Sequence, residues 1–214
     1  MLTIQYLAIA AAVFCICSLF VFFLRIIRLG KPKDLSEKSG DTGKGILYSN
    51  TVAMMPQNKE SAYLHIPGYA AGMLFHIGTF LSALIFVLSF FPFFNSWISG
   101  PDKIHLIIPV ILAVTCICGY ILLLRRAFSK DLKPLSNPDD YISNILTSTF
   151  QLFTMLYLLM PSCCCMPTAY YVMCIILFLY LPLGKLRHLV YYFAARYHLG
   201  FFYGWRNVWP KNED

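Results

Sequence analysis

The sequence predicts an all-α integral membrane protein, a five-helix bundle with its amino terminus outside the cell and its carboxyl terminus in the cytoplasm. Three observations predict this class. Hydrophobic residues make up 58% of the chain and charged residues only 13%, and mean hydropathy is +0.64. In addition, several apolar runs reach the roughly 20 residues that cross a bilayer. We therefore expect a single membrane domain over residues 1–214, surrounded by lipid.

The first two predicted helices are separated by the longest polar section of the chain. Residues 2–24 carry no charge and lack the basic start and cleavage site of a signal peptide, so we predict a first membrane helix. Residues 25–64 are rich in Lys, Ser, Gly and Asp, and indicate a cytoplasmic loop. The second helix, residues 67–94, begins at Pro67, whose missing N–H suits a first helical turn.

The third and fourth predicted helices are residues 104–124 and residues 141–160. Two arginines close the third helix. Asp139 or Asp140 can cap the fourth, because a carboxylate accepts hydrogen bonds from the free N–H groups of a first turn.

The fifth predicted helix, residues 168–195, is the segment on which the functional prediction depends. It begins as an apolar run and continues through Lys185, Arg187 and His188 before a cytoplasmic tail, residues 196–214. Ionisable groups inside a membrane helix usually have a specific use.

The cations fix the predicted orientation. In the five-helix arrangement, 16 of the 17 Lys and Arg residues fall on one side of the membrane, and only Lys103 falls on the other. Because cytoplasmic loops carry the excess of Lys and Arg, that side is the cytoplasmic one. The net charge of +7 is explained in this way without nucleic acid as a partner.

Eight cysteines show no disulfide framework. Two C-x-C pairs lie in apolar runs, where cysteine acts as a small hydrophobic residue. A helix points such thiols about 200° apart, so one metal ion would not be chelated. Cys163, Cys164 and Cys165 lie between two predicted helices. A compact turn is the simplest interpretation there, and oxidation or acylation is the alternative.

His76 and His188 are the candidate haem ligands. His76 lies about 13 Å along its helix from Pro67, and a lone buried imidazole is costly unless it has a partner. Each histidine follows a glycine by four residues, Gly72 and Gly184, on the same helix face. Because glycine has no side chain, each of these positions leaves room for a flat macrocycle against the backbone. Two neutral imidazoles suit axial ligation of haem b. A helix–helix hydrogen bond, either His–His or His–backbone, is the alternative.

Other polar residues near these histidines also have predicted roles. Lys185 and Arg187 could contact haem propionates. His65 and His198 could form a second bis-histidine site at the cytoplasmic boundary, or they could be interfacial histidines. Ten residues of helix leave His198 about 80° off the face of His188, which argues against a second haem.

Three segments resemble a known family. The segment LFHIG at Leu74–Gly78 and the segment LPLGKLRH at Leu181–His188 resemble the two haem-ligand segments of the gamma subunit of respiratory nitrate reductase. They also resemble related cytochrome b subunits of heterodisulfide reductases and sulfite-reduction-associated complexes. The loop Arg125–Tyr141 is similar to the cytoplasmic loop of that group. The resemblance covers the chain from the second helix onward.

The resemblance implies electron transfer between the quinone pool, menaquinone included, and a cytoplasmic iron–sulfur subunit through haem b. His76 and His188 match the ligands of the haem nearer the cytoplasm. The positions of the family's outer-haem ligands hold Phe86 and Tyr170 here, so we expect one haem, with two possible. His105 is interpreted as a solvated residue, with a quinone head-group contact as the alternative.

The sequence therefore predicts a membrane cytochrome b subunit of a respiratory oxidoreductase complex in the inner (cytoplasmic) membrane, catalytic only within that complex. The aromatic and basic end of the chain, residues 200–210, suits either partner docking or an interfacial aromatic belt. A haem-free quinone-interacting anchor is the first alternative. A small transporter is the second, disfavoured because no helix shows paired acidic residues or a broken centre.

Overall fold

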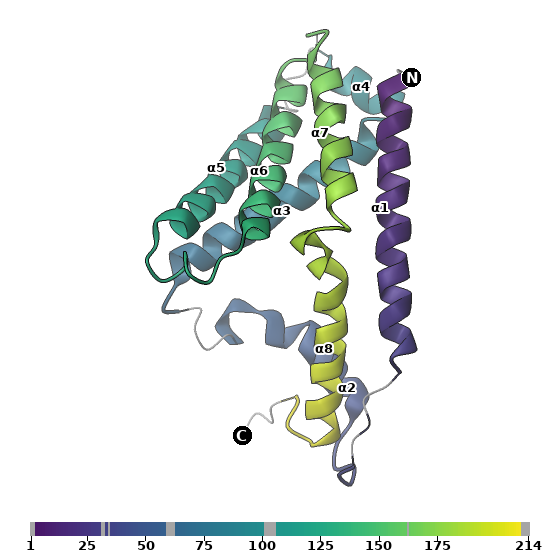
Figure 1. Ribbon diagram of the computed structural model, residues 1–214, viewed down its shortest axis with the longest axis vertical. Helices are drawn as coiled ribbons and strands as arrows, with labels where there is room; N and C mark the ends of the chain where they lie inside the picture. Colours follow the sequence, from purple (N-terminus) through teal and green to yellow (C-terminus); the bar gives the residue numbers. More distant parts are fainter. Residues whose placement is uncertain are drawn as a thin grey trace. The chain divides into compact units, whose positions relative to one another are not determined.

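The computed structural model describes residues 3–30, 33, 35–58, 63–100, 106–161 and 163–210, and over these residues the chain is all-helical (Figure 1). The α-helices are α1 (Thr3–Arg28), α2 (Thr42–Asn50), α3 (Ile66–Leu88), α4 (Pro92–Ile98), α5 (Ile107–Phe128), α6 (Pro138–Leu159), α7 (Met166–Tyr180) and α8 (His188–Trp205). Three-residue 3-10 turns are η1 (Val52–Met54), η2 (Pro56–Asn58) and η4 (Lys185–Arg187).

The membrane prediction is supported by four helices. Within the described residues, α1, α3, α5 and α6 are each long and apolar enough to cross a bilayer. The pair α7 and α8 makes a fifth span if the break between the two helices lies inside one crossing. The chain is thus a multi-pass membrane protein, and its described residues contain four or five candidate spans.

The fifth predicted helix, residues 168–195, is wrong as one continuous helix. Helix α7 ends at Tyr180 and α8 begins at His188. Pro182 lies between them; its ring clashes with the preceding turn and it has no N–H to donate. The N–H of Gly184 donates to the Tyr180 carbonyl at 2.9 Å and closes a turn. The broken helix also removes one of the two arguments against a transporter.

The second predicted helix also divides, because α3 ends at Leu88 and α4 begins at Pro92. The Ser89 hydroxyl donates to the Phe86 carbonyl at 2.7 Å, and Pro92 has no N–H with which to continue α3. The predicted range 67–94 therefore holds two helices.

The chain folds as two compact units, whereas the sequence predicts one domain. The first unit comprises Met1–Ile16 and Pro67–Leu186, and the second comprises Cys17–Ile66 and Arg187–Asp214. Helix α1 contributes to both. Each unit has its own packing.

In the first unit, α6 packs against α5 and α7. Its buried face carries polar side chains, short ones at Ser143, Thr147, Ser148 and Thr154 and an amide at Gln151. A Cβ on Gly119 of α5 would lie 2.5 Å from the Ser148 hydroxyl and 2.6 Å from the Phe75 ring. The helices can approach this closely only because small residues face each other, which is typical of membrane helix packing. The apolar core around them includes Ile85, Leu112, Phe150, Tyr171 and Leu177.

In the second unit, α2 packs against α8. The prediction that residues 25–64 form only a polar loop is wrong, because this range contains α2. A Cβ on Gly45 would lie 2.5 Å from the Gly200 carbonyl oxygen, so the two helices cross with their backbones in contact. The Ser49 hydroxyl donates to the Arg196 carbonyl at 2.7 Å, and Arg196 Nε donates to the Ser49 carbonyl at 2.8 Å.

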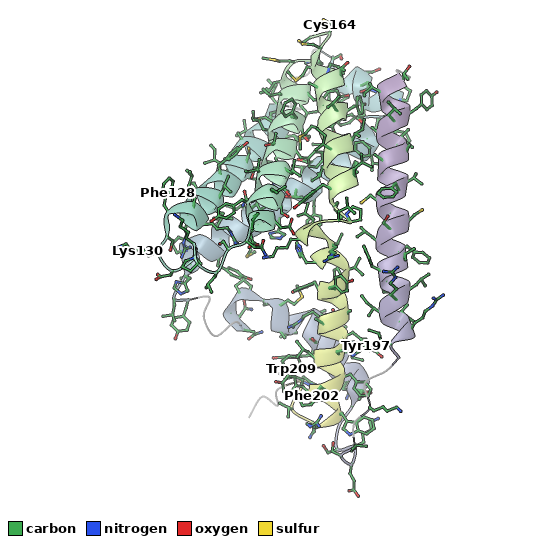
Figure 2. All side chains as sticks on the ribbon, in the orientation of Figure 1. Phe128, Lys130, Cys164, Tyr197, Phe202 and Trp209 are labelled. Carbon is green, nitrogen blue, oxygen red and sulfur yellow. The ribbon has the colours of Figure 1, made fainter. Side chains whose placement is uncertain are left out.

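Within the predicted tail, residues 196–205 form the second half of α8, and the described residues 196–210 fold against the polar loop. The Trp205 indole donates to the Ser36 carbonyl at 2.9 Å, and the Trp205 carbonyl accepts from the Gly40 N–H at 3.1 Å. Trp209 packs on Tyr203 with ring centroids 4.5 Å apart; Trp209 is labelled beside α8 in Figure 2. Two segments far apart in the sequence therefore stabilise each other.

Candidate functional site

His76 projects from α3 as an exposed side chain, not as the buried imidazole that the sequence predicts. Its Nδ1 lies 2.7 Å from the Gly72 carbonyl oxygen on its own helix. Because a carbonyl only accepts, Nδ1 carries the proton in the neutral ring and Nε2 keeps its lone pair. Metal-ligating histidines commonly have this arrangement, with one ring nitrogen fixed by a carbonyl and the other available for the metal.

The two glycines predicted to flank a macrocycle differ. A Cβ on Gly72 would meet nothing within 4 Å, so the backbone beside His76 faces open space. A Cβ on Gly184 would lie 2.4–2.6 Å from the Tyr180 ring, so that space is already filled. Gly184 also precedes α8 instead of lying in it. Gly184 and His188 therefore do not share a helix face, and this prediction is wrong.

His188 is the first residue of α8, with Arg187 at the N-cap position, and both side chains are exposed. His76 belongs to the first unit and His188 to the second. Their pairing stays a prediction, as does the contact of Arg187 with a haem propionate.

Lys185 forms an ion pair with a buried carboxylate. It is the other residue predicted to contact a haem propionate. Asp140 at the start of α6 has a side chain that is only 4% exposed, and it forms an ion pair with Lys185. Arg126 Nη1 lies 3.4 Å from the second oxygen of the same carboxylate. One carboxylate thus holds the cation-rich end of α5, the start of α6 and the turn after α7 together.

Asn137, not Asp139 or Asp140, caps α6. The Asn137 side chain accepts from the Asp140 N–H at 3.0 Å, and the Asp140 carboxylate accepts from the Asn137 N–H at 3.0 Å. This reciprocal pair is a capping box. In the sequence, Asn137 is followed three positions later by an acid, Asp140. This spacing is typical of a capping box and predicts the role of Asp140.

A buried amide lies beside the turn of α3 that carries His76. Gln151 of α6 is 0% exposed. Its Nε2 donates to the Phe75 carbonyl and to the Thr79 hydroxyl, both at 2.9 Å. The Thr115 hydroxyl of α5 donates to the Gln151 Oε1 at 2.8 Å. This network joins three helices and fixes the rotation of α3. This network is not among the contacts predicted from the sequence, although a lone glutamine in an apolar run is a signal for such a contact.

Phe86 and Tyr170, which stand where the family would place outer-haem ligands, lie in the core of the first unit. The Phe86 ring packs on Phe178 with centroids 4.8 Å apart, and the Tyr170 ring stacks on Tyr157 at 4.6 Å. The Phe86 and Tyr170 rings therefore fill space in the hydrophobic core.

Two further histidines, His65 and His198, lie within the described residues. His65 is exposed just before α3, and His198 is half-buried on α8 with its ring edge-on to Tyr197. A second bis-histidine site built from His65 and His198 stays a prediction. His105 lies outside the described residues.

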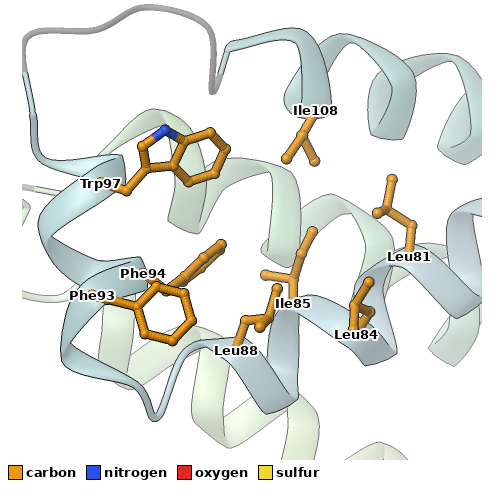
Figure 3. A pocket seen from close by; sticks show the side chains of 8 residues that line it. All are labelled: Leu81, Leu84, Ile85, Leu88, Phe93, Phe94, Trp97 and Ile108. Carbon is orange, nitrogen blue, oxygen red and sulfur yellow. The ribbon is translucent and has the colours of Figure 1, made fainter.

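An apolar pocket of about 370 Å³ lies between α3, α4 and α5 (Figure 3). Its lining is Leu81, Leu84, Ile85, Leu88, Phe93, Phe94, Trp97 and Ile108. A pocket of this size and lining suits part of a hydrophobic molecule.

Comparisons with protein-family models, curated proteins and solved structures find no match for this chain. In the part of the chain that the structure describes, no group of three or more His, Cys, Asp or Glu side chains could hold a metal ion. A haem needs only two axial imidazoles, so the candidate ligands remain His76 and His188.

Proposed function

We propose that this chain is a membrane cytochrome b subunit that relays electrons between the quinone pool and a cytoplasmic iron–sulfur partner. The observation that carries the proposal is the geometry of His76: an exposed imidazole on an apolar helix, with Nδ1 fixed by the Gly72 carbonyl and Nε2 available. A haem b held by His76 and His188 would supply one-electron transfer.

The residues around His76 fit such a group. Gly72 leaves open space beside the imidazole, and the Gln151 network holds the neighbouring Phe75 carbonyl. His76 would bind the iron through Nε2, and because its tautomer is already fixed, little reorganisation of the side chain would be needed. The resemblance supplies His188 as the second ligand.

A reduced-minus-oxidised spectrum of the purified chain tests the proposal. His76→Ala and His188→Ala should each abolish the b-type absorption while membrane content stays unchanged. His65→Ala is the matched histidine control and should keep the spectrum. Full haem content in either ligand variant would overturn the assignment.

We further propose one haem per chain, because aromatic packing occupies the positions of outer-haem ligands at Phe86 and Tyr170. Haem-to-protein stoichiometry by pyridine haemochrome should give a value near one. A value near two that falls to one in His198→Ala would establish the second site instead.

The proposed orientation has the amino terminus outside, supported by the 16-to-1 division of cations. A thiol-reactive probe should reach a cysteine placed at Ser99 from the outer side and one placed at Ser136 from the cytoplasm. The proposed iron–sulfur subunit should copurify as a cysteine-rich cytoplasmic protein.

The second candidate function is a haem-free quinone-interacting anchor. The pocket between α3, α4 and α5 favours it, because its apolar lining suits an isoprenoid tail. Absence of the b-type spectrum together with quinone binding that is weakened by Leu84→Trp would select this function.

A further inference from the structure

The turn between α6 and α7 brings two thiols together. The Sγ atoms of Cys163 and Cys165 lie 3.3 Å apart. Cys165 is exposed and Cys163 is partly exposed, and Figure 2 labels Cys164 at the end of this turn. The Cys163 N–H donates to the Met160 carbonyl at 3.1 Å, and its carbonyl accepts from the Met166 N–H at 3.3 Å. These bonds bend the chain so that alternate thiols meet, unlike thiols of a C-x-C pair on a helix.

The two thiols are chemically unequal. The pKa of Cys163 is lowered by the hydrogen bond from the Cys165 thiol, and then by the backbone N–H groups of Cys165 and Met166. The pKa of Cys165 is raised, chiefly by its hydrogen bond to Cys163. A thiolate is the nucleophile in thiol–disulfide exchange, so Cys163 would attack first and Cys165 would follow.

The other cysteines are placed differently. Cys15, Cys116 and Cys174 are buried in α1, α5 and α7. Cys17 and Cys118 lie within α1 and α5, helices that qualify as membrane spans. In this turn, therefore, two thiols lie close together and can be reached from water. In the orientation proposed above, it faces the outer side.

We propose that Cys163 and Cys165 form a reversible dithiol–disulfide site that exchanges with an external disulfide. The Cys163 thiolate attacks one sulfur of the external disulfide, forms a mixed disulfide and releases the first external thiolate, which takes up a proton. Cys165 then loses its proton and attacks the Cys163 sulfur, so that a Cys163–Cys165 bond forms and the second external thiol leaves. The dithiol loses two electrons and two protons, and the external disulfide gains them.

Bond formation needs the sulfurs to approach from 3.3 Å to about 2.05 Å. Both residues lie in a turn outside the buried core, with Cys165 exposed and Cys163 partly exposed, so rotation about their Cα–Cβ bonds does not disturb that core. Cys164, between them, is exposed and has no part in the step.

The test uses the full chain in lipid nanodiscs with oxidised glutathione as the external disulfide. Maleimide labelling should show the reversible loss of two reactive thiols, restored by a reducing agent. Mass spectrometry should locate the bond between Cys163 and Cys165. Cys164→Ser should behave as the native chain does, whereas Cys163→Ser and Cys165→Ser should each abolish the bond.

The order of attack gives a second readout. Cys165→Ser should accumulate a glutathione adduct on Cys163, because the nucleophile is then trapped without its partner. A bond that involves Cys164, no loss of paired thiols, or equal adducts at all three cysteines would overturn the proposal.

Discussion

Lys185 forms an ion pair with Asp140, and through it the turn after α7 is joined to the first turn of α6. The carboxylate is buried while the Lys185 side chain is 53% exposed, so the pair lies at the boundary of the first unit's helices. Arg126 shares the same carboxylate at 3.4 Å. A cation that the sequence assigns to a haem propionate therefore has a structural role as well.

Removing the Asp140 charge should destabilise the first unit. Asp140→Asn keeps the size and an acceptor for the Asn137 N–H, but leaves two cations without their carboxylate. We expect a loss of about 1–2 kcal/mol in unfolding free energy, below the ~3–5 of a fully buried pair, because both cations are partly solvated. Thermal unfolding in detergent micelles measures it. Asp139→Asn is the matched control and should change stability less; equal losses would contradict the structural role of Asp140.

Replacing Gln151 should lower the unfolding free energy more than replacing its polar neighbours on α6. Gln151→Leu removes both donors and one acceptor from the network with Phe75, Thr79 and Thr115, at a cost of about 1 kcal/mol. Thr154→Val is a suitable control, because the Thr154 hydroxyl donates only within its own helix, to Phe150. Unfolding of both variants in the same micelles gives the comparison. If Thr154→Val loses as much stability as Gln151→Leu, the network does not hold the three helices together.

The packing of α2 against α8 should be disrupted when a methyl group is added at Gly45. The new Cβ would lie 2.5 Å from backbone atoms of Gly200 and Gly204, which cannot move as a flexible side chain could. Hydrogen exchange of α2 amides should therefore accelerate about tenfold or more in Gly45→Ala. Leu47 is 66% exposed on the same helix, so Leu47→Ala should leave these amides protected. Unchanged exchange in Gly45→Ala would show that α2 does not depend on α8.

Acid should loosen the start of α2. The backbone N–H groups of Lys44 and Gly43 donate to the Asp41 carboxylate and lower its pKa. A lowered folded-state pKa means that this carboxylate stabilises the fold above its unfolded value of about 3.9, and that the stabilisation is lost as pH falls through the folded value. Exchange of α2 amides, corrected for intrinsic rates, should rise below about pH 4. Asp41→Asn keeps an uncharged acceptor, so its corrected exchange should not follow this titration.

The helix content of the membrane spans could be predicted from the sequence, because an apolar run in lipid must satisfy its own backbone hydrogen bonds. The runs behind α1, α3, α5 and α6 lead directly to spanning helices. The predicted helices 67–94 and 168–195 are interrupted near Pro92 and Pro182, because a proline inside an apolar run has no N–H with which to continue a helix.

The tertiary structure alone decided which polar residues meet. Asp140, Lys185 and Arg126 are far apart in the sequence, and so are α2 and α8; their association depends on packing, which no local pattern encodes. The approach of the Cys163 and Cys165 thiols likewise depends on how the turn bends, because the same spacing on a helix points them apart. The sequence by itself determined a multi-pass membrane chain and named His76 and His188 as candidate ligands. The tautomer of His76, the filled space at Gly184 and the buried Gln151 network were decided by contacts between helices and by side-chain geometry.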